Sequence, residues 1–128
     1  MKVSGIVTSG AGQGAKFLAL DWVAAQIQHH LTLTSFPGTL NLRVERAVRA
    51  ALFAQRNGFL RIADSSAPDC PGYLKKVGLR ANGRKCDEAW VILPEKTMYD
   101  DVLEIISAYN LREALALKDG DTVEIELQ

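Results

Sequence analysis

The sequence predicts a mainly β protein with short helices, folded as a small closed barrel of six strands. Three observations lead to this class. The chain has 128 residues, which suits a single domain covering residues 1–128. Apolar residues make up 48% of it, enough for a substantial core. Short alternating or apolar segments recur between turn signals, whereas long helical patterns are few.

Strands are predicted where side chains alternate or where a short apolar run ends at a turn. Residues 2–8 alternate and run into a glycine-rich turn, and residues 122–127 alternate as a closing strand. The remaining candidate strands are residues 39–44, 59–62, 73–79 and 89–93, and residues 101–106 are an apolar run with one acid inside it, Glu104. Asn82-Gly83 is a strong hairpin signal, and residues 64–72 have the composition of an exposed loop.

Two helices are predicted from apolar side chains at helical spacing. The first covers residues 22–30, with Asp21 as its N-cap. The second covers residues 45–57 and is followed by Gly58, a common residue after a helix end. Its apolar stripe is Ala47, Val48, Ala51 and Leu52, and its arginines Arg46, Arg49 and Arg56 fall mostly off the stripe. A helical turn is expected over residues 110–115.

Charge and cysteine content narrow the function classes. Lys plus Arg equals Asp plus Glu at 15 each, and this zero net charge argues against a dedicated nucleic-acid binder. Cys70 and Cys86 form no CxxC pair and lie far from His29 and His30, so a zinc site is not expected. The cysteines are interpreted as free thiols, with a disulfide left open. No apolar run is long enough to span a membrane, and no signal-peptide core is present. A cytoplasmic monomer with neither membrane nor nucleic-acid partners is expected.

A glycine-rich turn, Ser9 to Ala15, follows the first predicted strand. Its pattern is G-x-G-x-G, with glycines at Gly10, Gly12 and Gly14. Glycines can adopt positive φ and let a ligand approach the backbone, so the turn is a candidate phosphate-binding loop. It is neither a P-loop nor a Rossmann fingerprint, because the GK[ST] ending and the G-x-G-x-x-G spacing are missing. A flexible hairpin connection is the alternative.

Thr39 and Asn41 form a second polar feature. Side chains two apart on a strand share a face, so these two point away from Leu40 and Leu42, which face the core. Their neutral oxygens suit a hard cation that already holds phosphate. The alternative is an ordinary solvent-facing pair. Together with the glycine turn, the pair indicates a nucleotide site.

Three further side chains are chemical candidates. Glu104 lies in an apolar run and needs a partner, because burying an unpaired carboxylate is costly. It either points outward from a strand or accepts hydrogen bonds from a ligand. Arg112 is either a surface ion-pair partner or an arginine directed at phosphate. Thr97, after a proline-containing turn, offers a hydroxyl.

In combination these segments resemble a known family. The order is S-G-x-G-x-G-x-x-F-L-x-L, F-P-G-T-L-N-L, P-E-K-T-x-Y, D-V-L-E-I-I and N-L-R-E-x-L-x-L-K-D-G-D-x-V-E-I. This order and wording resemble the archaeal-type CTP-dependent riboflavin kinases. The match covers residues 5–44 and 90–126, and the T-x-N strand and the L-R-E-x-L-x-L-x-D-G-D ending are its most specific parts.

The resemblance implies a cradle-loop barrel of the riboflavin-synthase-like kind that transfers the γ-phosphoryl of CTP to the 5′-hydroxyl of riboflavin. It also implies the catalytic domain without the winged-helix extension that family members often carry. Thr39 and Asn41 would bind Mg²⁺, and Thr97 and Glu104 would contact the flavin, with Glu104 the candidate base. The implied nucleotide-binding residues are Gly10, Ala11, Gly12, Gln13, Gly14, Ala15, Tyr109, Asn110, Leu111 and Arg112.

Two other hypotheses stay open at this point. The first is a non-catalytic module that binds a nucleotide or flavin, which is motivated by Met98 standing where the family pattern has histidine. The second is a DNA-binding regulator, because the closing L-x-L-K-D-G-D-x-V-E-I-E segment also resembles swapped-hairpin barrels that dimerise by exchanging strands. The zero net charge and the glycine turn weigh against the regulator.

Overall fold

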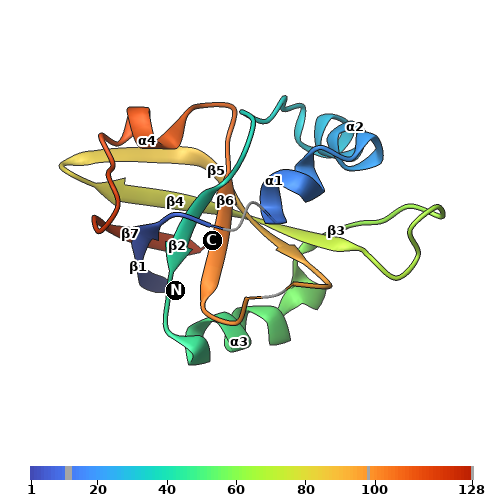
Figure 1. Ribbon diagram of the computed structural model, residues 1–128, viewed down its shortest axis with the longest axis horizontal. Coiled ribbons are helices and arrows are strands. Elements are labelled where there is room, and N and C mark those ends of the chain that lie inside the picture. The colour runs from blue at the N-terminus through green and yellow to red at the C-terminus, as the bar shows by residue number, and fades with distance from the viewer. Residues whose placement is uncertain (11–12, 98, 128) are drawn as a thin grey trace.

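A computed structural model describes residues 1–10, 13–97 and 99–127 (Figure 1). The strands are β1 (Lys2–Thr8), β2 (Leu40–Arg43), β3 (Leu60–Ile62), β4 (Gly72–Ala81), β5 (Arg84–Pro94), β6 (Val102–Ile106) and β7 (Thr122–Leu127). The helices are α1 (Gln13–Leu18), α2 (Asp21–Leu31), α3 (Arg46–Ala54) and α4 (Leu111–Ala114), with a 3-10 turn, η1 (Arg56–Gly58). No helix of the described residues is long and apolar enough to cross a membrane.

Six antiparallel strands close into a barrel, as the sequence predicts. Their order is β4-β5-β6-β2-β1-β7, and β7 pairs back onto β4 to complete the circle. The long β4 shares one edge between two partners. Its first residues pair with the short β3, and its later residues, from Val77 to Arg80, pair with β7. A register shift between Val77 and Leu79 marks the point where β4 changes partner.

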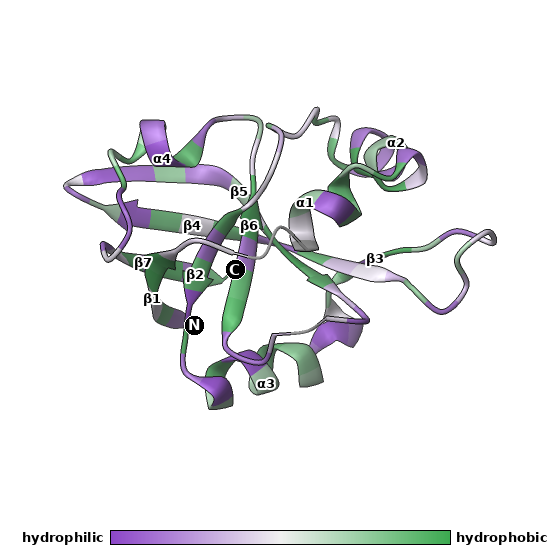
Figure 2. Cartoon of the chain, viewed as in Figure 1, coloured by the Kyte–Doolittle hydropathy of each residue, from purple (hydrophilic) through white to green (hydrophobic). Residues whose placement is uncertain are grey.

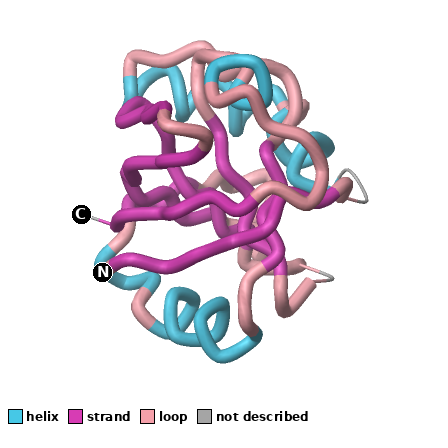
Figure 3. Tube along the Cα trace, turned by 90° about the vertical axis from the view of Figure 1, so that its left-hand side faces the viewer, coloured by secondary structure: helices cyan, strands magenta, loops and turns pink. Residues whose placement is uncertain are grey.

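Hydrophobic and hydrophilic residues alternate along parts of the strands (Figure 2), and the buried side chains form two apolar clusters. Inward side chains fill the barrel, among them Leu42, Val91 and Leu103. Outward side chains of β4, β5 and β6 build a smaller cluster against α2, where Ile92 and Ile106 meet Val23 and Ile27. Seen from the side, the strands lie between α3 at one end of the barrel and the other helices at the opposite end (Figure 3). The outer layer matters for function because Glu104 lies on the same outward face.

Several local predictions are confirmed and two are wrong. β1 and β7 cover the predicted residues, and Asn82 and Gly83 both have positive φ, as their hairpin turn requires. The predicted glycine turn leads directly into a helix, because α1 begins at Gln13. Asp21 is the first residue of α2 and its N-cap is Leu20, so the predicted cap is one residue off. Arg49 was placed off the apolar stripe of α3, yet its side chain is buried.

Candidate functional site

The site is centred on the outward face of two neighbouring strands, β2 and β6. Asn41 and Glu104 lie directly opposite each other in the antiparallel register. Leu40 and Leu42 point into the barrel and are buried, so the alternation places Asn41 outward, as predicted. Thr39 lies just before β2, and its hydroxyl oxygen donates a hydrogen bond to Asn41 Oδ1 at 3.3 Å. The structure therefore brings Thr39, Asn41 and Glu104 together on one face.

The glycine loop lies directly over this pair. A Cβ atom at Gly10 would lie 2.6 Å from Asn41 Cγ, and a Cβ atom at Gly14 would lie 2.5 Å from Glu104 Cδ. Both distances are shorter than ordinary Cβ contacts, so a side chain at either position would displace Asn41 or Glu104. Neither residue has a positive φ, so the conformational reason given for these glycines in the sequence analysis does not apply to them. The side chains of Asn41 and Glu104 occupy the space that side chains at Gly10 and Gly14 would fill.

A hydrogen bond joins the loop to the strand. The backbone N–H of Gly14 donates to Glu104 Oε1 at 2.9 Å in a buried setting. Gly14 lies in the first turn of α1, where backbone N–H groups have no acceptor within the helix. The carboxylate supplies that acceptor from a residue 90 positions away. The partner that Glu104 needed, according to the sequence, is thus the glycine loop.

Glu104 is 6% exposed, so its charge is costly to maintain. Burial raises the pKa of this carboxyl above its usual value, and the Gly14 N–H and the Arg49 guanidinium act in the opposite direction. Arg49, on α3, donates from Nε to the carbonyl oxygen of Val102 at 3.0 Å. A buried carboxylate with an amide donor and a nearby cation is a group suited to accepting a proton or a hydroxyl hydrogen bond.

A chain of polar contacts ties α4 to the start of the glycine loop. Asp119 accepts from Arg112 Nη2 at 2.7 Å through one oxygen and from the Ser9 hydroxyl at 3.0 Å through the other. These two hydrogen bonds, with that of Arg112 the larger influence, lower the pKa of Asp119. Asn110 caps α4 by accepting from the N–H of Glu113 at 3.3 Å. Arg112 is therefore an ion-pair partner in this structure, and its partner also holds the loop.

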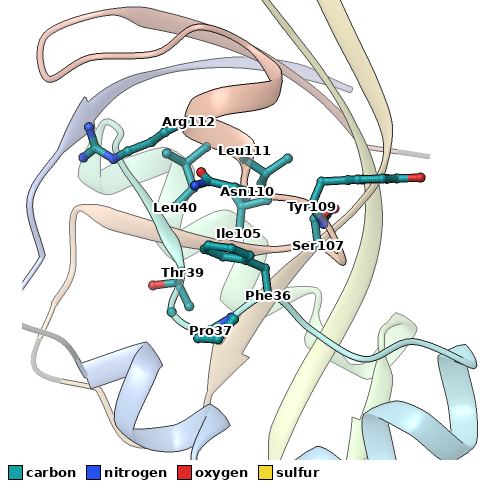
Figure 4. A pocket seen from close by; sticks show the side chains of 11 residues that line it. Phe36, Pro37, Thr39, Leu40, Ile105, Ser107, Tyr109, Asn110, Leu111 and Arg112 are labelled. Carbon is teal, nitrogen blue, oxygen red and sulfur yellow. Dashed lines mark hydrogen bonds between the residues drawn. The ribbon is translucent and has the colours of Figure 1, made fainter.

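A small hollow of about 110 Å³ separates the segment after α2 from the segment before α4 (Figure 4). The N–H of Phe36 donates to the carbonyl oxygen of Ser107 at 2.7 Å and keeps the two segments side by side. Thr39 and Arg112 lie on one side of the hollow in this view, and Tyr109 lies on the other. Phe36 and Tyr109 are both exposed large hydrophobic residues at its rim. The hollow thus unites Thr39 with the predicted nucleotide-binding residues 109–112.

Two larger cavities of about 510 Å³ each flank the centre. One lies between α3 and the segment after β5, and Thr97, Phe53 and Arg49 are among its lining residues. The other lies between α1, α2 and residues 33–38, and its lining carries no charged side chain. Cavities of this size accommodate a drug-sized planar ligand.

The residues of this site lie within a segment that matches a known protein family. A family model named CTP-dep_RFKase, described as "Domain of unknown function DUF120", matches residues 7–127. The chain belongs to this family. Proteins similar to this CTP-dep_RFKase member include "Riboflavin kinase" of Archaeoglobus fulgidus, 37% identical over 131 residues, which cover 99% of this chain and 54% of the relative.

Two further relatives carry the same name. "Riboflavin kinase" of Thermoplasma acidophilum is 37% identical over 128 residues, covering 98% of this chain and 56% of the relative. "Riboflavin kinase" of Saccharolobus solfataricus is 33% identical over 131 residues, covering 99% of this chain and 74% of the relative. The chain spans about half the length of the first of these relatives, 54%.

The structure brings most of the predicted site residues together, but Thr97 lies apart from them. Gly10, Gly14, Thr39, Asn41 and Glu104 form one centre. The side chain of Thr97 lines the cavity beside α3, where its hydroxyl accepts from the N–H of Tyr99 at 3.2 Å. Gln13 and Ala15 are residues of α1. Ala11, Gly12 and Met98 lie outside the described residues.

Sequence reasoning missed two contributors to the centre. Asp119, which holds Arg112 and Ser9, was noted only as part of the L-R-E-x-L-x-L-x-D-G-D ending, without a role of its own. The sequence feature that could have indicated a role for Asp119 is the acidic turn directly before the closing strand. Arg49 was interpreted as a residue off the apolar stripe, and no sequence signal distinguishes it from Arg46. Within the described residues no cluster of three or more His, Cys, Asp or Glu side chains has metal-binding geometry.

Proposed function

We propose that this chain is a riboflavin kinase that uses CTP as its phosphoryl donor and yields FMN and CDP. The single observation that carries the proposal is the contact of the glycine loop with both Asn41 and Glu104. It places a loop of backbone donors, a pair of neutral oxygens and a buried carboxylate in one centre. Phosphoryl transfer requires little of the protein beyond such positioning and charge stabilisation. Membership of the CTP-dep_RFKase family and relatives named riboflavin kinase support the same function.

The residues present fit a bound Mg²⁺. Thr39 Oγ1 and Asn41 Oδ1 are 3.3 Å apart, half-buried, and neutral. Mg²⁺ prefers oxygen ligands and usually binds few protein groups while keeping waters and substrate phosphates. Thr39 and Asn41 would hold the ion, which when bound would neutralise charge on the phosphates. Two neutral ligands leave the full charge of the ion for that purpose.

Some of the site residues bind the phosphoryl donor, and Glu104 faces the phosphoryl acceptor. The glycine loop and Arg112 bind the nucleotide phosphates through backbone N–H groups and a guanidinium. Glu104 faces the acceptor hydroxyl with Oε2, because Oε1 accepts from Gly14. The hydroxyl oxygen attacks the γ-phosphorus, the bond from that phosphorus to the bridging oxygen breaks, and CDP leaves. The hydroxyl proton passes to Glu104, whose pKa burial raises.

The test is a turnover assay with riboflavin, Mg²⁺ and CTP, with ATP, GTP and UTP run in parallel and FMN quantified by chromatography. CTP is expected to support FMN formation. Asn41→Ala is expected to lose at least about 100-fold in rate, because several kcal/mol of metal-dependent charge stabilisation would be removed. Asn57→Ala is the matched control, since Asn57 is an exposed amide in η1, away from the site.

Each hypothesis has its own outcome. No FMN from any nucleotide would sink the kinase proposal, and riboflavin quenching without transfer would favour the binding module. Equal rates for Asn41→Ala and Asn57→Ala would show that Asn41 does not hold the metal. The DNA-binding alternative requires strands exchanged between two chains, whereas this barrel closes within one chain through the β4–β7 pairing.

A further inference from the structure

The most unusual side chain outside the proposed chemistry is Arg49. It lies on α3 and is 5% exposed, although arginine is almost never buried unless it is fully paired. Among the described residues, its one hydrogen bond runs from Nε to the carbonyl oxygen of Val102 at 3.0 Å. The guanidinium has five N–H donors, so its two terminal NH₂ groups are left for another partner. In the described part of the chain, the fully buried side-chain atoms that lack a partner do not include these nitrogens, so a ligand in the adjoining space can reach them.

The cavity beside α3 gives that partner a place. Arg49 lines it together with Ala50, Phe53, Thr97 and Tyr99. Its volume is about 510 Å³, and its wall combines the aromatic rings of Phe53 and Tyr99 and the small side chains of Ala50 and Thr97 with charged residues. A planar heteroaromatic ligand fits such a space. Ligand pockets of this kind rely on a few fixed polar groups for orientation, and a buried guanidinium is one.

Of the other charged residues that line the cavity, Lys96 is exposed to solvent, and Arg46, Asp100 and Glu95 each have an ion-pair partner. Arg46 pairs with Asp100 at 3.0 Å on the exposed side. Glu95 pairs with Arg56 at 3.3 Å. The guanidinium of Arg56 in turn lies over the ring of Phe53, 4.3 Å from its centre. Arg49 is therefore the buried cation of this cavity with donors to offer, and they suit an oxygen acceptor held inside.

Arg49 is also fixed in place. Its Nε bond attaches the guanidinium to the backbone of β6, two residues before Glu104 on the same outward face. A ligand whose ring meets Arg49 would therefore lie beside the strand that carries Glu104. Side chains at positions 102 and 104 of one strand are about 7 Å apart, which is the scale of a short polyol chain between a ring and a terminal hydroxyl.

On the proposed function, we propose that Arg49 is a specificity-determining residue that donates hydrogen bonds to a carbonyl oxygen on the pyrimidinedione edge of the flavin ring, bound in the cavity beside α3. The ring would lie against the small and aromatic wall. The ribityl chain would extend along β6 toward Glu104. Arg49 therefore distinguishes an acceptor with ring carbonyls from a polyol or sugar that offers only the hydroxyl.

The first experiment needs no variant and no catalysis. Riboflavin, 2-thioriboflavin and 4-thioriboflavin are titrated into the wild-type protein, and each Kd is read from flavin fluorescence or absorbance. Sulfur is a much weaker hydrogen-bond acceptor than oxygen, so one thio analogue is expected to bind about 10- to 100-fold more weakly than riboflavin. Equal affinities for all three would overturn the proposal.

The second experiment assigns the discrimination to Arg49. Arg49→Met is expected to bind riboflavin more weakly by a similar factor and to bind riboflavin and both thio analogues equally. Arg80→Met is the matched control, because Arg80 is an exposed arginine on β4 that does not line this cavity. It is expected to retain wild-type affinities. Circular dichroism checks that each variant is folded, and an Arg49→Met protein that keeps wild-type discrimination would assign the effect to another residue.

The two proposals fail in different ways. If the protein binds riboflavin with thio discrimination but forms no FMN, the kinase proposal fails and the role of Arg49 stands. If it forms FMN while the thio analogues and riboflavin bind alike, the kinase proposal stands and the role of Arg49 fails. Binding of the ring in the uncharged cavity between α1 and α2 would give this second result.

Discussion

Replacing Gly14 by alanine tests the contact on which the site depends. Alanine is normally the better helix residue, and in a helix interior this exchange stabilises by up to about 1 kcal/mol. Here a Cβ would lie 2.5 Å from Glu104 Cδ, so the carboxylate must move and its hydrogen bond from the Gly14 N–H is lost or weakened. Loss of a hydrogen bond to a charged group costs about 1.5–3 kcal/mol. The net expectation is a loss of about 0.5–2 kcal/mol of unfolding free energy.

The assay is urea unfolding followed by circular dichroism, with FMN formation measured on the same preparations. Gly58→Ala is the matched control, because Gly58 ends η1 and a Cβ there would meet no atom within 4 Å. This control is expected to stay within about 0.5 kcal/mol of wild type. If Gly14→Ala is as stable as Gly58→Ala or more stable, and turnover is unchanged, the packing of the loop on Glu104 is not what positions the site.

Three further predictions follow from the same contacts. Glu104→Gln should abolish turnover yet raise the unfolding free energy in metal-free buffer at neutral pH, and this gain should shrink at acid pH. Burial raises the pKa of Glu104 in the folded protein above its usual value, so the stability that comes from the protonated carboxyl is present at acid pH and is lost as the pH rises through the raised pKa. A wild type that is more stable than the variant at pH 7 contradicts this prediction. Asp119→Asn should raise the KM for CTP severalfold with little change in kcat or in the unfolding midpoint, because Arg112 and Ser9 lose a shared anchor. Glu124→Gln, which breaks the exposed Lys2 pair of 3.8 Å, is its control and should leave KM unchanged. Thr39→Val should raise the Mg²⁺ concentration needed for half-maximal turnover, because one oxygen ligand is lost. Thr122→Val, on an exposed strand position, should leave that concentration unchanged.

The parts of the fold that sequence could predict are those set by local periodicity. The period-2 pattern of residues 39–42 places Leu40 and Leu42 inside and Asn41 outside, and the register confirms it. Asn82-Gly83 determines its own turn through positive φ. The predicted alternation of residues 122–127 is likewise present in β7, where every second residue is buried. None of these features depends on a distant residue.

The parts that sequence could not predict depend on contacts between distant segments. Glu104 and Gly14 are 90 positions apart, and no local pattern indicates that one supplies the acceptor for the other. The requirement for glycine at Gly10 comes from the Asn41 side chain and has no connection with the φ angle. Arg49 lies at the edge of a helical stripe, and its burial depends on packing against the start of β6, where it donates to Val102. Tertiary packing therefore determined these three features.

The shared hydrogen bond between Gly14 and Glu104 has a chemical consequence on the proposed function. A backbone N–H has one proton to donate, so a nucleotide phosphate that recruits the Gly14 amide competes with Glu104 for it. Loss of that donor leaves the buried carboxylate with less stabilisation of its charge and a greater tendency to take a proton. The carboxylate would thereby become a better acceptor for the flavin hydroxyl at the moment when the phosphoryl donor is in place. One N–H group thus connects the two halves of the site, and for this reason a change at Gly14 should alter the kinetics of both substrates.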